Sequence, residues 1–437
     1  MVKRGLSILR SLALKGSIAL ADQAVTSGTN FVISILLGRA LSPADFGAYS
    51  LAYSILLFIA GFHNAGIIEP FSVYGAGRFR EDFRSYVGAL VKWQELGIGI
   101  ICVLGLVLVV SLSGYFPDVM RSNGVGLLLS TPLIVLAWFF RRVYYVLGDP
   151  LWSLYGGILQ SVLVLTGVSV GFHYLRSSGF LAFQALGVGT GAMAVFLWAR
   201  TRPRIEWTLL PSEFERKVLR THWEYGRWGL LTNIVYWFSG YGYTSLIGAF
   251  LGLSEIGALR AMQNLVNPLG LVLTALSTIM VPWMVRGTAQ RGYRWLSRTV
   301  PLVAVAFAAL ACLVLGPVVL LGHQFDDILY DGRYAGFVWL LPFGALVQVF
   351  SAFTSAVAMG LQVLERPRRI FYGYAAAALT TVTFGFPAVY YRGLLGAMFG
   401  TVVTAGVLSG VVYWNWNVEC RARTSVADER CQKGSEN

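Results

Sequence analysis

The stretch LGLSEIGALRAMQNLVN, which runs from Leu251 to Asn267, places an arginine inside a long apolar segment of the chain. A guanidinium near the middle of a bilayer-spanning helix costs about 2.5–3.5 kcal/mol on insertion scales, so Arg260 is seldom kept there without a use. Polar residues follow Arg260 at helical spacing, and Leu271 is the one apolar member of the row. They are Asn264, Asn267, Thr274 and Thr278. The pattern predicts a membrane helix whose polar face lines a path for an anionic amphiphile.

The composition of the whole chain is that of a membrane protein. Of its 437 residues 56% are hydrophobic and only 13% are charged, whereas a soluble protein carries about 25% charged residues. The apolar residues come in runs of twenty or more, which is the length of an α-helix that spans a bilayer. Backbone groups in lipid must pair internally, and these runs are too long and too uniform for β-barrel strands. The sequence therefore predicts an all-α polytopic membrane protein.

Twelve membrane spans can be drawn, six in each half of the chain. The first six are Leu14–Leu37, Phe46–Ile68, Tyr86–Leu112, Val125–Leu147, Leu151–Tyr174 and Gly179–Ala199. The second six are Trp228–Leu251, Ile256–Trp283, Val300–Leu321, Ala335–Leu361, Ile370–Tyr390 and Leu394–Trp414. We therefore expect an N-lobe at 1–199, a cytoplasmic linker with a short amphipathic helix at 200–227, a C-lobe at 228–416, and a disordered polar cytoplasmic tail at 417–437.

Lysine and arginine are distributed unevenly over the predicted loops. With the N-terminus inside, 27 of the 34 fall in cytoplasmic segments. Five fall in outer loops, namely Arg39, Arg121, Arg176, Arg333 and Arg392. Because positive residues concentrate on the cytoplasmic side, both termini are predicted in the cytoplasm and the protein in the cytoplasmic (inner) membrane. The same bias explains the net charge of +13, so the charge indicates no nucleic-acid partner.

The chain also repeats itself. A shift of 210 residues aligns Gly38 with Gly248 and Gly47 with Gly257, in the short connection between the first two spans of each half. The last span of each half carries small residues at a spacing that suits close helix packing. These are Gly187 and Gly191 in one half and Gly396 and Gly400 in the other. Six spans are an even number, so the two lobes form a parallel repeat, a recurrent transporter design with the site in an inter-lobe cavity.

The second half supplies the first set of candidate cavity residues. Arg260 can face the cavity and hold a phosphate or carboxylate bidentately, or it can snorkel to the nearby outer interface. Asn264 and Asn267 continue its polar face. Asn233 and Tyr236 combine an amide with a ring, which are the groups that sugars bind; an aromatic belt at the interface is the alternative, and it accounts for Tyr241 and Tyr243.

The first half supplies polar residues on its first two spans. The first span is too polar to face lipid, and Asn30 lies on one of its polar rows, as Ser50 does on the second span. Asp22 can act as a carboxylate that couples transport to protons or cations, or it can pair with a neighbouring lysine or arginine. His63 can titrate during transport, although a lone histidine is more often a packing residue.

Three further cations lie near the predicted cytoplasmic mouth. Lys92 is three residues before Glu95, and the two can neutralise each other on a helix. Arg141 and Arg142 can receive a pyrophosphate that enters from the cytoplasm, or they can contact lipid headgroups.

Signals of soluble enzymes are absent from the sequence. It has no phosphate-binding glycine loop, no zinc-spaced cysteine and histidine set and no nucleophile motif. The longest outer loop, about Gly322 to Tyr334, is too short for a folded catalytic domain. We therefore expect no enzyme activity, no cofactor and no metal.

Four stretches resemble a known family. LLGRALSPADFGAYSLAYSI at 36–55 and LGLSEIGALRAMQNLVNPLG at 251–270 look like the two signature stretches of Wzx-type polysaccharide flippases. LYDGRYAGFVWLLP at 329–342 and YRGLLGAMFG at 391–400 fit the later helices of that family. The resemblance runs over nearly the whole chain.

This resemblance implies the fold of the multidrug/oligosaccharidyl-lipid/polysaccharide exporters, with two six-helix lobes around a cavity that opens alternately to each side. The implied cargo is a polyprenyl-pyrophosphate-linked oligosaccharide, which moves from the inner to the outer leaflet, and the implied partners are the polymerase and glycosyltransferases of the same pathway. Arg260 is the best candidate to bind the pyrophosphate. Two alternatives remain: a cation-coupled multidrug or small-metabolite antiporter of the same fold, and a membrane-embedded polysaccharide polymerase.

Overall fold

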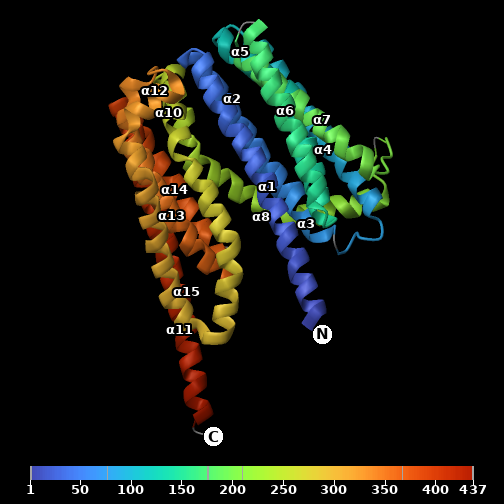
Figure 1. The fold of residues 1–437 in the computed structure, drawn as a ribbon, viewed down its shortest axis with the longest axis vertical. Coiled ribbons are helices and arrows are strands. Elements are labelled where there is room, and N and C mark those ends of the chain that lie inside the picture. Colours follow the sequence, from blue (N-terminus) through green and yellow to red (C-terminus); the bar gives the residue numbers. More distant parts are fainter. Residues whose placement is uncertain (1, 76, 175–176, 209, 367, 436–437) are drawn as a thin grey trace. The chain divides into compact units, whose positions relative to one another are not determined.

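The computed structural model describes residues 2–75, 77–174, 177–208, 210–366 and 368–435, and every regular element in these ranges is a helix (Figure 1). The side chains of residues 2–14, 228, 278 and 424–435 are not part of this description. The chain divides into two compact units, Met1–Ile234 and Val235–Asn437.

The first unit is built on six long helices, a short π-helix and the short helix α3, and most of α8. They are α1 (Val2–Ala40), α2 (Pro43–His63) with the π-helix η1 (Asn64–Ile68) and α3 (Glu69–Tyr74), α4 (Phe83–Ser111), α5 (Asp118–Val146), α6 (Pro150–Tyr174), α7 (Gly179–Thr201) and α8 (Glu213–Gly240). Helix α5 packs on α7, α4 and α2, and α6 packs on α7 and α1. The core of the unit is aromatic, because the rings of Phe71, Tyr86 and Phe139 are in contact and fully buried.

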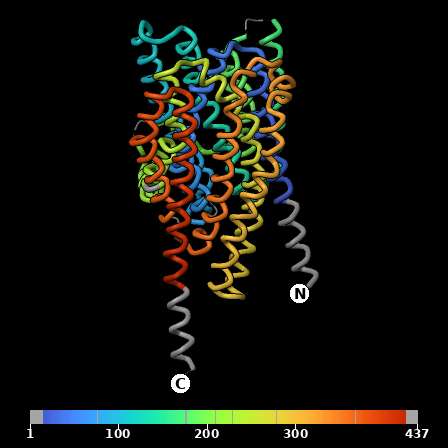
Figure 2. The backbone as a smooth tube through the Cα atoms, turned by 90° about the vertical axis from the view of Figure 1, so that its left-hand side faces the viewer, coloured from blue at the N-terminus to red at the C-terminus, as the bar shows by residue number. Residues whose placement is uncertain are grey.

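The second unit has α9 (Gly242–Phe250), α10 (Leu253–Val266), α11 (Pro268–Leu320), α12 (Gly322–Tyr330), the 3-10 helix η2 (Ala335–Leu340), α13 (Leu341–Val363), α14 (Arg368–Thr380), the π-helix η3 (Thr381–Gly385) and α15 (Phe386–Ser435). Helix α13 packs on α11 and α15, and α15 packs on α14 and α9. Helix α11 is two helices in space, because Gly292 has φ 76°, and Figures 1 and 2 show the chain doubling back within this helix, between its yellow and orange parts.

Each of the twelve predicted spans lies in a helical segment, but the helices do not divide where the spans do. Of the helices in the described residues, eight are long and apolar enough to cross a membrane by length and composition. The number of these helices is smaller than twelve partly because one continuous helical run can include residues of two predicted spans. This is so for α11, and also for the run from α14 into α15 across Gly393. Helix α1 is not among the eight spanning candidates, because its polar rows make it less apolar than they are.

The small residues predicted to allow close helix packing do so. A Cβ on Gly187 would lie 2.7 Å from the hydroxyl of Ser130 on α5. A Cβ on Gly400 would lie 2.7 Å from the ring of Tyr243. Tyr243 itself is buried and hydrogen-bonds Thr404 through its hydroxyl at 2.9 Å, so the prediction that this tyrosine belongs to an interfacial aromatic belt is wrong.

The tail is helical where the sequence predicts disorder. Helix α15 continues past the last predicted span and ends at Ser435. Glu419 holds the first turns of this extension, because its carboxylate pairs with Arg366 at 2.9 Å and with Arg369 at 3.4 Å. Arg423 adds a hydrogen bond of 2.7 Å to the carbonyl of Leu364. The composition of the tail predicted disorder because it carries no signal of these partners, which lie fifty or more residues away in the sequence.

Helix α8 begins inside the predicted linker and runs without a break into the predicted seventh span. A capping box starts it: Ser212 Oγ accepts from the Glu215 amide at 3.2 Å, and Glu215 Oε2 accepts from the Ser212 amide at 3.1 Å. Further along, Gly226 lies close to η1, where a Cβ on Gly226 would come within 2.7 Å of the Ala65 carbonyl oxygen. The linker helix is therefore a packed part of the first unit.

His222 anchors α8 to η1 and α4. Pro70 has no amide proton, so it cannot donate to the carbonyl of Gly66 four residues earlier. That carbonyl instead accepts a hydrogen bond of 3.0 Å from His222 Nδ1. The Tyr86 hydroxyl lies 2.6 Å from His222 Nε2, and because Nδ1 carries the proton, Nε2 accepts from Tyr86. These two bonds hold a buried, neutral imidazole.

We predict that the stability of the His222→Gln variant falls less steeply at acidic pH than the stability of the wild type. Burial lowers the pKa of His222 from 6.5 to about 4, against the opposing effect of the Gly66 carbonyl. A histidine with a lowered pKa stabilises the fold fully above pH 6.5, and this contribution is lost as the pH falls through 4. Glutamine can make both hydrogen bonds without titrating. Thermal unfolding of the purified protein at several pH values should show a difference in pH dependence of about 2–3 kcal/mol near pH 4.5.

The matched control is His173→Gln, because His173 is exposed at the end of α6. It should leave the pH dependence unchanged. Parallel pH curves for the wild type and His222→Gln would contradict the role of His222.

Candidate functional site

Asp22 is the centre of a buried polar cluster in the first unit. It is fully buried on α1. Its Oδ2 accepts hydrogen bonds from Arg141 at 2.9 Å, from the Tyr145 hydroxyl at 2.5 Å and from the Ser153 hydroxyl at 3.0 Å. Arg141 and Tyr145 lie on α5 and Ser153 on α6, so one carboxylate oxygen joins three helices. Of the two alternatives for Asp22, the structure thus shows the pairing with an arginine, and Arg141 is that arginine.

The other carboxylate oxygen of Asp22 is buried without a hydrogen-bond partner among the described residues. It faces Gly157 on α6, where a Cβ would lie 2.9 Å away. Glycine at this position allows α1 and α6 to approach. Further along α1, Thr29 donates to the buried Ser161 hydroxyl at 2.7 Å, which continues the polar contact between the two helices.

The two remaining candidates of the first spans differ in access. Asn30 is exposed on the other polar row of α1. Ser50 is buried and donates to the carbonyl of Phe46 on its own helix at 2.7 Å. Asn30 can therefore contact a solute in this structure, whereas the hydroxyl of Ser50 is already used by the backbone.

The three cytoplasmic-mouth cations have different surroundings. Lys92 is buried and pairs with both oxygens of Glu215 at 2.9 Å, so its expected pairing with Glu95 is wrong. Burial alone would raise the pKa of Glu215, but hydrogen bonds from Lys92 and the Ser212 amide hold it below its ordinary value. Sequence spacing could not find this partner, because Glu215 lies in the linker.

Arg142 is the one of the three cations that has no hydrogen-bond or ion-pair partner within the part of the chain that the structure describes. Its side chain is half-buried. Arg141 repels it electrostatically and Glu69 attracts it, while a Glu69 oxygen accepts from Asn64 at 2.8 Å. A half-buried guanidinium in such a position can take an anion with little rearrangement.

His63 belongs to a hydrogen-bond relay between α2 and α4. Gln94 donates from its amide nitrogen to Glu95 at 3.1 Å. Its amide oxygen therefore accepts from His63 Nε2, 3.1 Å away, which assigns the proton of the neutral ring to Nε2. His63 is buried and Glu95 half-buried, so the relay leads from the interior of the unit towards its surface.

The polar row of the second unit separates into packed and accessible members. Asn264 is buried and donates to the Tyr330 hydroxyl at 3.0 Å. Arg260 is half-buried and interacts electrostatically with the same tyrosine. Asn267 is exposed, and its Oδ1 accepts from Gln348 on α13 at 3.0 Å. The side chain of Thr278, the last member of the row, lies outside the described residues.

The loop after α12 fixes the tyrosine that meets this row. Asp326 is fully buried, and both its oxygens accept from the Tyr334 amide, at 3.3 and 3.2 Å. Burial raises the pKa of Asp326, an effect that the Tyr334 amide opposes. Asp331 turns the chain with φ 56°. The stretch LYDGRYAGFVWLLP therefore has a structural task, which is to hold Tyr330 against α10.

The two sugar-binding candidates fall in different units. Asn233 donates to the carbonyl of Phe58 on α2 at 3.2 Å and packs so closely on Gly61 that a Cβ there would clash. Tyr236 is 46% exposed and meets Tyr374 edge to face at 5.2 Å between ring centroids. Part of the Tyr236 side chain is exposed and can contact a sugar, whereas Asn233 serves helix packing.

Comparison with known sequences points to polysaccharide biosynthesis. Residues 158–329 match a family model described as polysaccharide biosynthesis protein. The succinoglycan biosynthesis transport protein ExoT of Rhizobium meliloti (strain 1021) is 25% identical over 265 residues, which cover 59% of this chain and 50% of that protein. The chain thus spans about half the length of this curated relative.

Solved structures of transporters share the fold. The inward-facing conformation of a multidrug resistance MATE family transporter of the MOP superfamily gives a TM-score of 0.76 at 14% identity, over 93% of this chain and 99% of that one. The lipid II flippase MurJ, in an inward closed conformation, gives 0.70 at 11% identity over 94% and 87%. A MOP superfamily transporter from Pyrococcus furiosus gives 0.64 at 15% identity over 94% and 96%.

The chain is an all-helical, multi-pass membrane protein with the fold of MATE and MurJ transporters. The sequence matches confirm the resemblance to polysaccharide biosynthesis transport proteins, and the structure matches confirm the fold. The relative and the fold neighbours named above are described as transporters, in line with the prediction of a transporter and not an enzyme.

We predict that loss of Arg141 alone costs more stability than loss of both members of its ion pair with Asp22. Arg141→Gln leaves a buried carboxylate without its cation and should lower the free energy of unfolding by about 3–5 kcal/mol. The double variant Asp22→Asn/Arg141→Gln should recover part of this loss. Thermal unfolding in detergent measures the four proteins of the cycle, and additive losses would refute the coupling of the two side chains.

Proposed function

We propose that this protein translocates a polyprenyl-pyrophosphate-linked oligosaccharide from the inner to the outer leaflet of the cytoplasmic membrane, for the synthesis of a surface polysaccharide. The observation that carries the proposal is the match to a polysaccharide biosynthesis family on a transporter fold. Residues 1–199 and 228–416 act as two six-helix lobes with a cavity between them, which opens alternately to each side. Both termini face the cytoplasm.

The headgroup of such a cargo requires cationic side chains that can contact phosphate oxygens. Arg141 and Lys92 are committed to Asp22 and Glu215. Arg142 in the first unit and Arg260 in the second are half-buried guanidinium groups and bind the pyrophosphate at different stages of transport. Guanidinium groups suit this task because they bind phosphate oxygens bidentately.

The sugar and the tail of the cargo need different surroundings. Asn30 and Asn267 present exposed amides, and Tyr236 presents an exposed ring, so they contact sugar hydroxyls and CH faces. The polyprenyl tail stays in the bilayer, where it needs no protein site. The polymerase and glycosyltransferases of the same pathway are the proposed partners, because they supply and consume the cargo.

We predict that Arg142→Gln and Arg260→Gln each slow translocation about tenfold or more. Each variant removes a charge-assisted hydrogen-bond donor, and such bonds contribute about 1.5–3 kcal/mol. The measurement is the rate at which a labelled lipid-linked oligosaccharide becomes accessible to a lectin outside proteoliposomes. Arg220→Gln is the matched control, because Arg220 is an exposed arginine of α8 that pairs with the exposed Glu224.

Each arginine is judged separately in this experiment. Arg142→Lys keeps the charge but loses the bidentate geometry, so it should retain an intermediate rate. Unchanged transport in a correctly inserted glutamine variant would remove that arginine from the mechanism.

The second candidate function is a cation-coupled antiporter of the same fold. The observation that favours it is the buried, unpartnered Oδ1 of Asp22 among the described residues, because a coupling ion or proton needs such an oxygen. The ion pair of Asp22 with Arg141 opposes it, since Arg141 already supplies a positive charge.

We predict that Asp22→Asn leaves glycan translocation within about threefold of the wild type and changes no drug tolerance. The variant keeps most hydrogen bonds of the cluster and removes only the ionisable group. Translocation in the proteoliposome assay and growth of an expressing strain on cationic drugs measure the two effects. Drug efflux that vanishes in this variant would favour the antiporter.

A further inference from the structure

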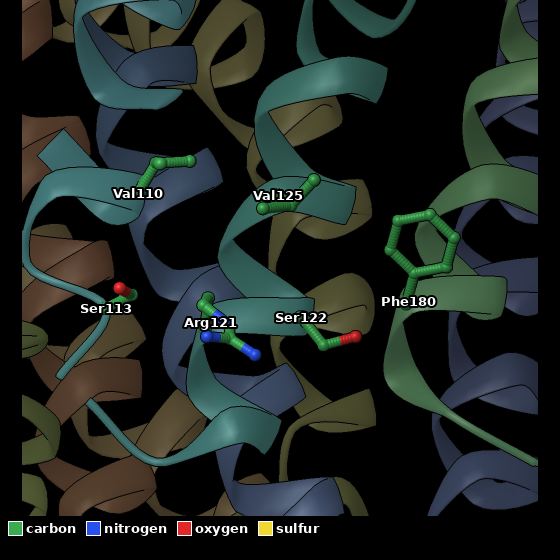
Figure 3. A pocket seen from close by; sticks show the side chains of 6 residues that line it. All are labelled: Val110, Ser113, Arg121, Ser122, Val125 and Phe180. Carbon is green, nitrogen blue, oxygen red and sulfur yellow. The ribbon is translucent and has the colours of Figure 1, made fainter. Parts of the chain in front are cut away.

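A cavity of about 440 Å³ lies in the first unit where α4 ends and where α5 and α7 begin. It is lined by Val110, Ser113, Arg121, Ser122, Val125 and Phe180. Figure 3 shows Val110 of α4 and Ser113 of the following turn on one side of it, Phe180 of α7 on the other, and the α5 residues between them. All six residues belong to one unit, and the cavity is separate from Asp22, Arg142 and the polar row of α10.

The residues that line the cavity are part apolar and part polar, as a site for an amphiphile requires. Val110, Val125 and Phe180 form an apolar part, and two serine hydroxyls with one guanidinium form a polar part. The Arg121 guanidinium pairs with Asp118 at 2.8 Å. The side chains of this pair are 43% and 88% exposed, so an exposed negative group stands beside the guanidinium that lines the cavity.

The surface that leads to the cavity is apolar and belongs to a helix of membrane-spanning length. Four aliphatic side chains of α4 one to two turns before the cavity are 58–64% exposed. They are Val103, Leu104, Val107 and Leu108. Such a surface faces lipid chains in a membrane. The charged pair lies at the first turn of α5, where a spanning helix meets the headgroup region.

We propose that this cavity binds a membrane phospholipid whose headgroup carries both a phosphate and an ammonium group, as an ethanolamine headgroup does. Arg121 contacts the phosphate and Asp118 the ammonium, while the hydroxyls of Ser113 and Ser122 donate to phosphate oxygens. An acyl chain lies along the aliphatic residues of α4. The site is independent of the proposed cargo and of its translocation.

Charge complementarity selects this headgroup over a purely anionic one. A phosphatidylglycerol headgroup would bring a negative phosphate to Arg121 and leave Asp118 without a positive partner from the lipid, beside another negative charge. An ethanolamine lipid satisfies both members of the pair. The preference therefore comes from Asp118, whereas affinity for any phospholipid comes from Arg121.

The experiment measures lipid retained by the full-length protein with native mass spectrometry, after incubation with phosphatidylethanolamine or phosphatidylglycerol of identical chains. The wild type should retain several-fold more of the ethanolamine lipid. Arg121→Gln should lower retention of both lipids about tenfold. Asp118→Asn should abolish the preference and keep binding of phosphatidylglycerol. Arg39→Gln is the matched control, because Arg39 is an exposed arginine at the end of α1, and it should change neither value.

A second variant tests the cavity itself. Val125→Trp fills it and should lower retention of the ethanolamine lipid, whereas Val103→Trp on the exposed surface of α4 should not. Retention that is unchanged in both Arg121→Gln and Val125→Trp would overturn the proposal. A headgroup preference that survives Asp118→Asn would overturn the assignment of the ammonium, and displacement by inorganic phosphate alone would show a phosphate site and not a lipid site.

Discussion

A charge inside a membrane protein must be paired or must serve a ligand, and this constraint organises the first unit. Asp22 is held by Arg141, and Lys92 is held by Glu215. Both pairs join helices that are far apart in the sequence, so each fixes a packing arrangement as well as a charge. Buried pairs contribute little net stability, but loss of one partner is costly. The consequence for function is that these four side chains are not available to a ligand. Of Lys92, Arg141 and Arg142, only Arg142 has no such partner in the described part of the chain.

The two halves share a sequence repeat but not its charges. The shift of 210 residues aligns Ser50 with Arg260. Ser50 is buried and bonds its own helix, whereas Arg260 is half-buried beside Tyr330. Beside Arg260, the second unit pairs a buried polar group with a neutral one, in the hydrogen bond from Asn264 to Tyr330. A cargo with one charged end suits such unequal halves, because its pyrophosphate and its sugars need different partners.

The helices could be predicted from the sequence, but the partners of the charged residues could not. Apolar runs reveal spans because the bilayer demands them, and glycine spacing correctly placed Gly187 and Gly400 at close contacts. Local spacing favoured Glu95 for Lys92, yet the carboxylate that binds it lies 123 residues away. Arg141 is likewise 119 residues from Asp22. Such pairs follow from tertiary packing, and one sequence holds no local signal for them. The spacing of Ser212 and Glu215 is that of a capping box, which is a sequence signal for the start of α8. The glutamate of this capping box is also the partner of Lys92.

Helix α8 runs without a break from the first unit into the second. Its first part is fixed by Glu215, His222 and Gly226, and Asn233 still bonds α2. The boundary between the units follows at 234–235, and α8 continues to Gly240 with Tyr236 exposed beyond that boundary. Alternating access, as proposed here, requires the lobes to reorient. The anchored residues cannot follow such a reorientation without breaking buried hydrogen bonds. The backbone therefore has to bend in the segment after Asn233. Gly240 and Gly242 flank the end of this segment, where a Cβ on Gly240 would meet no atom within 4 Å. A lobe movement would then shift Tyr236, a proposed sugar contact, relative to Arg142, a proposed headgroup contact.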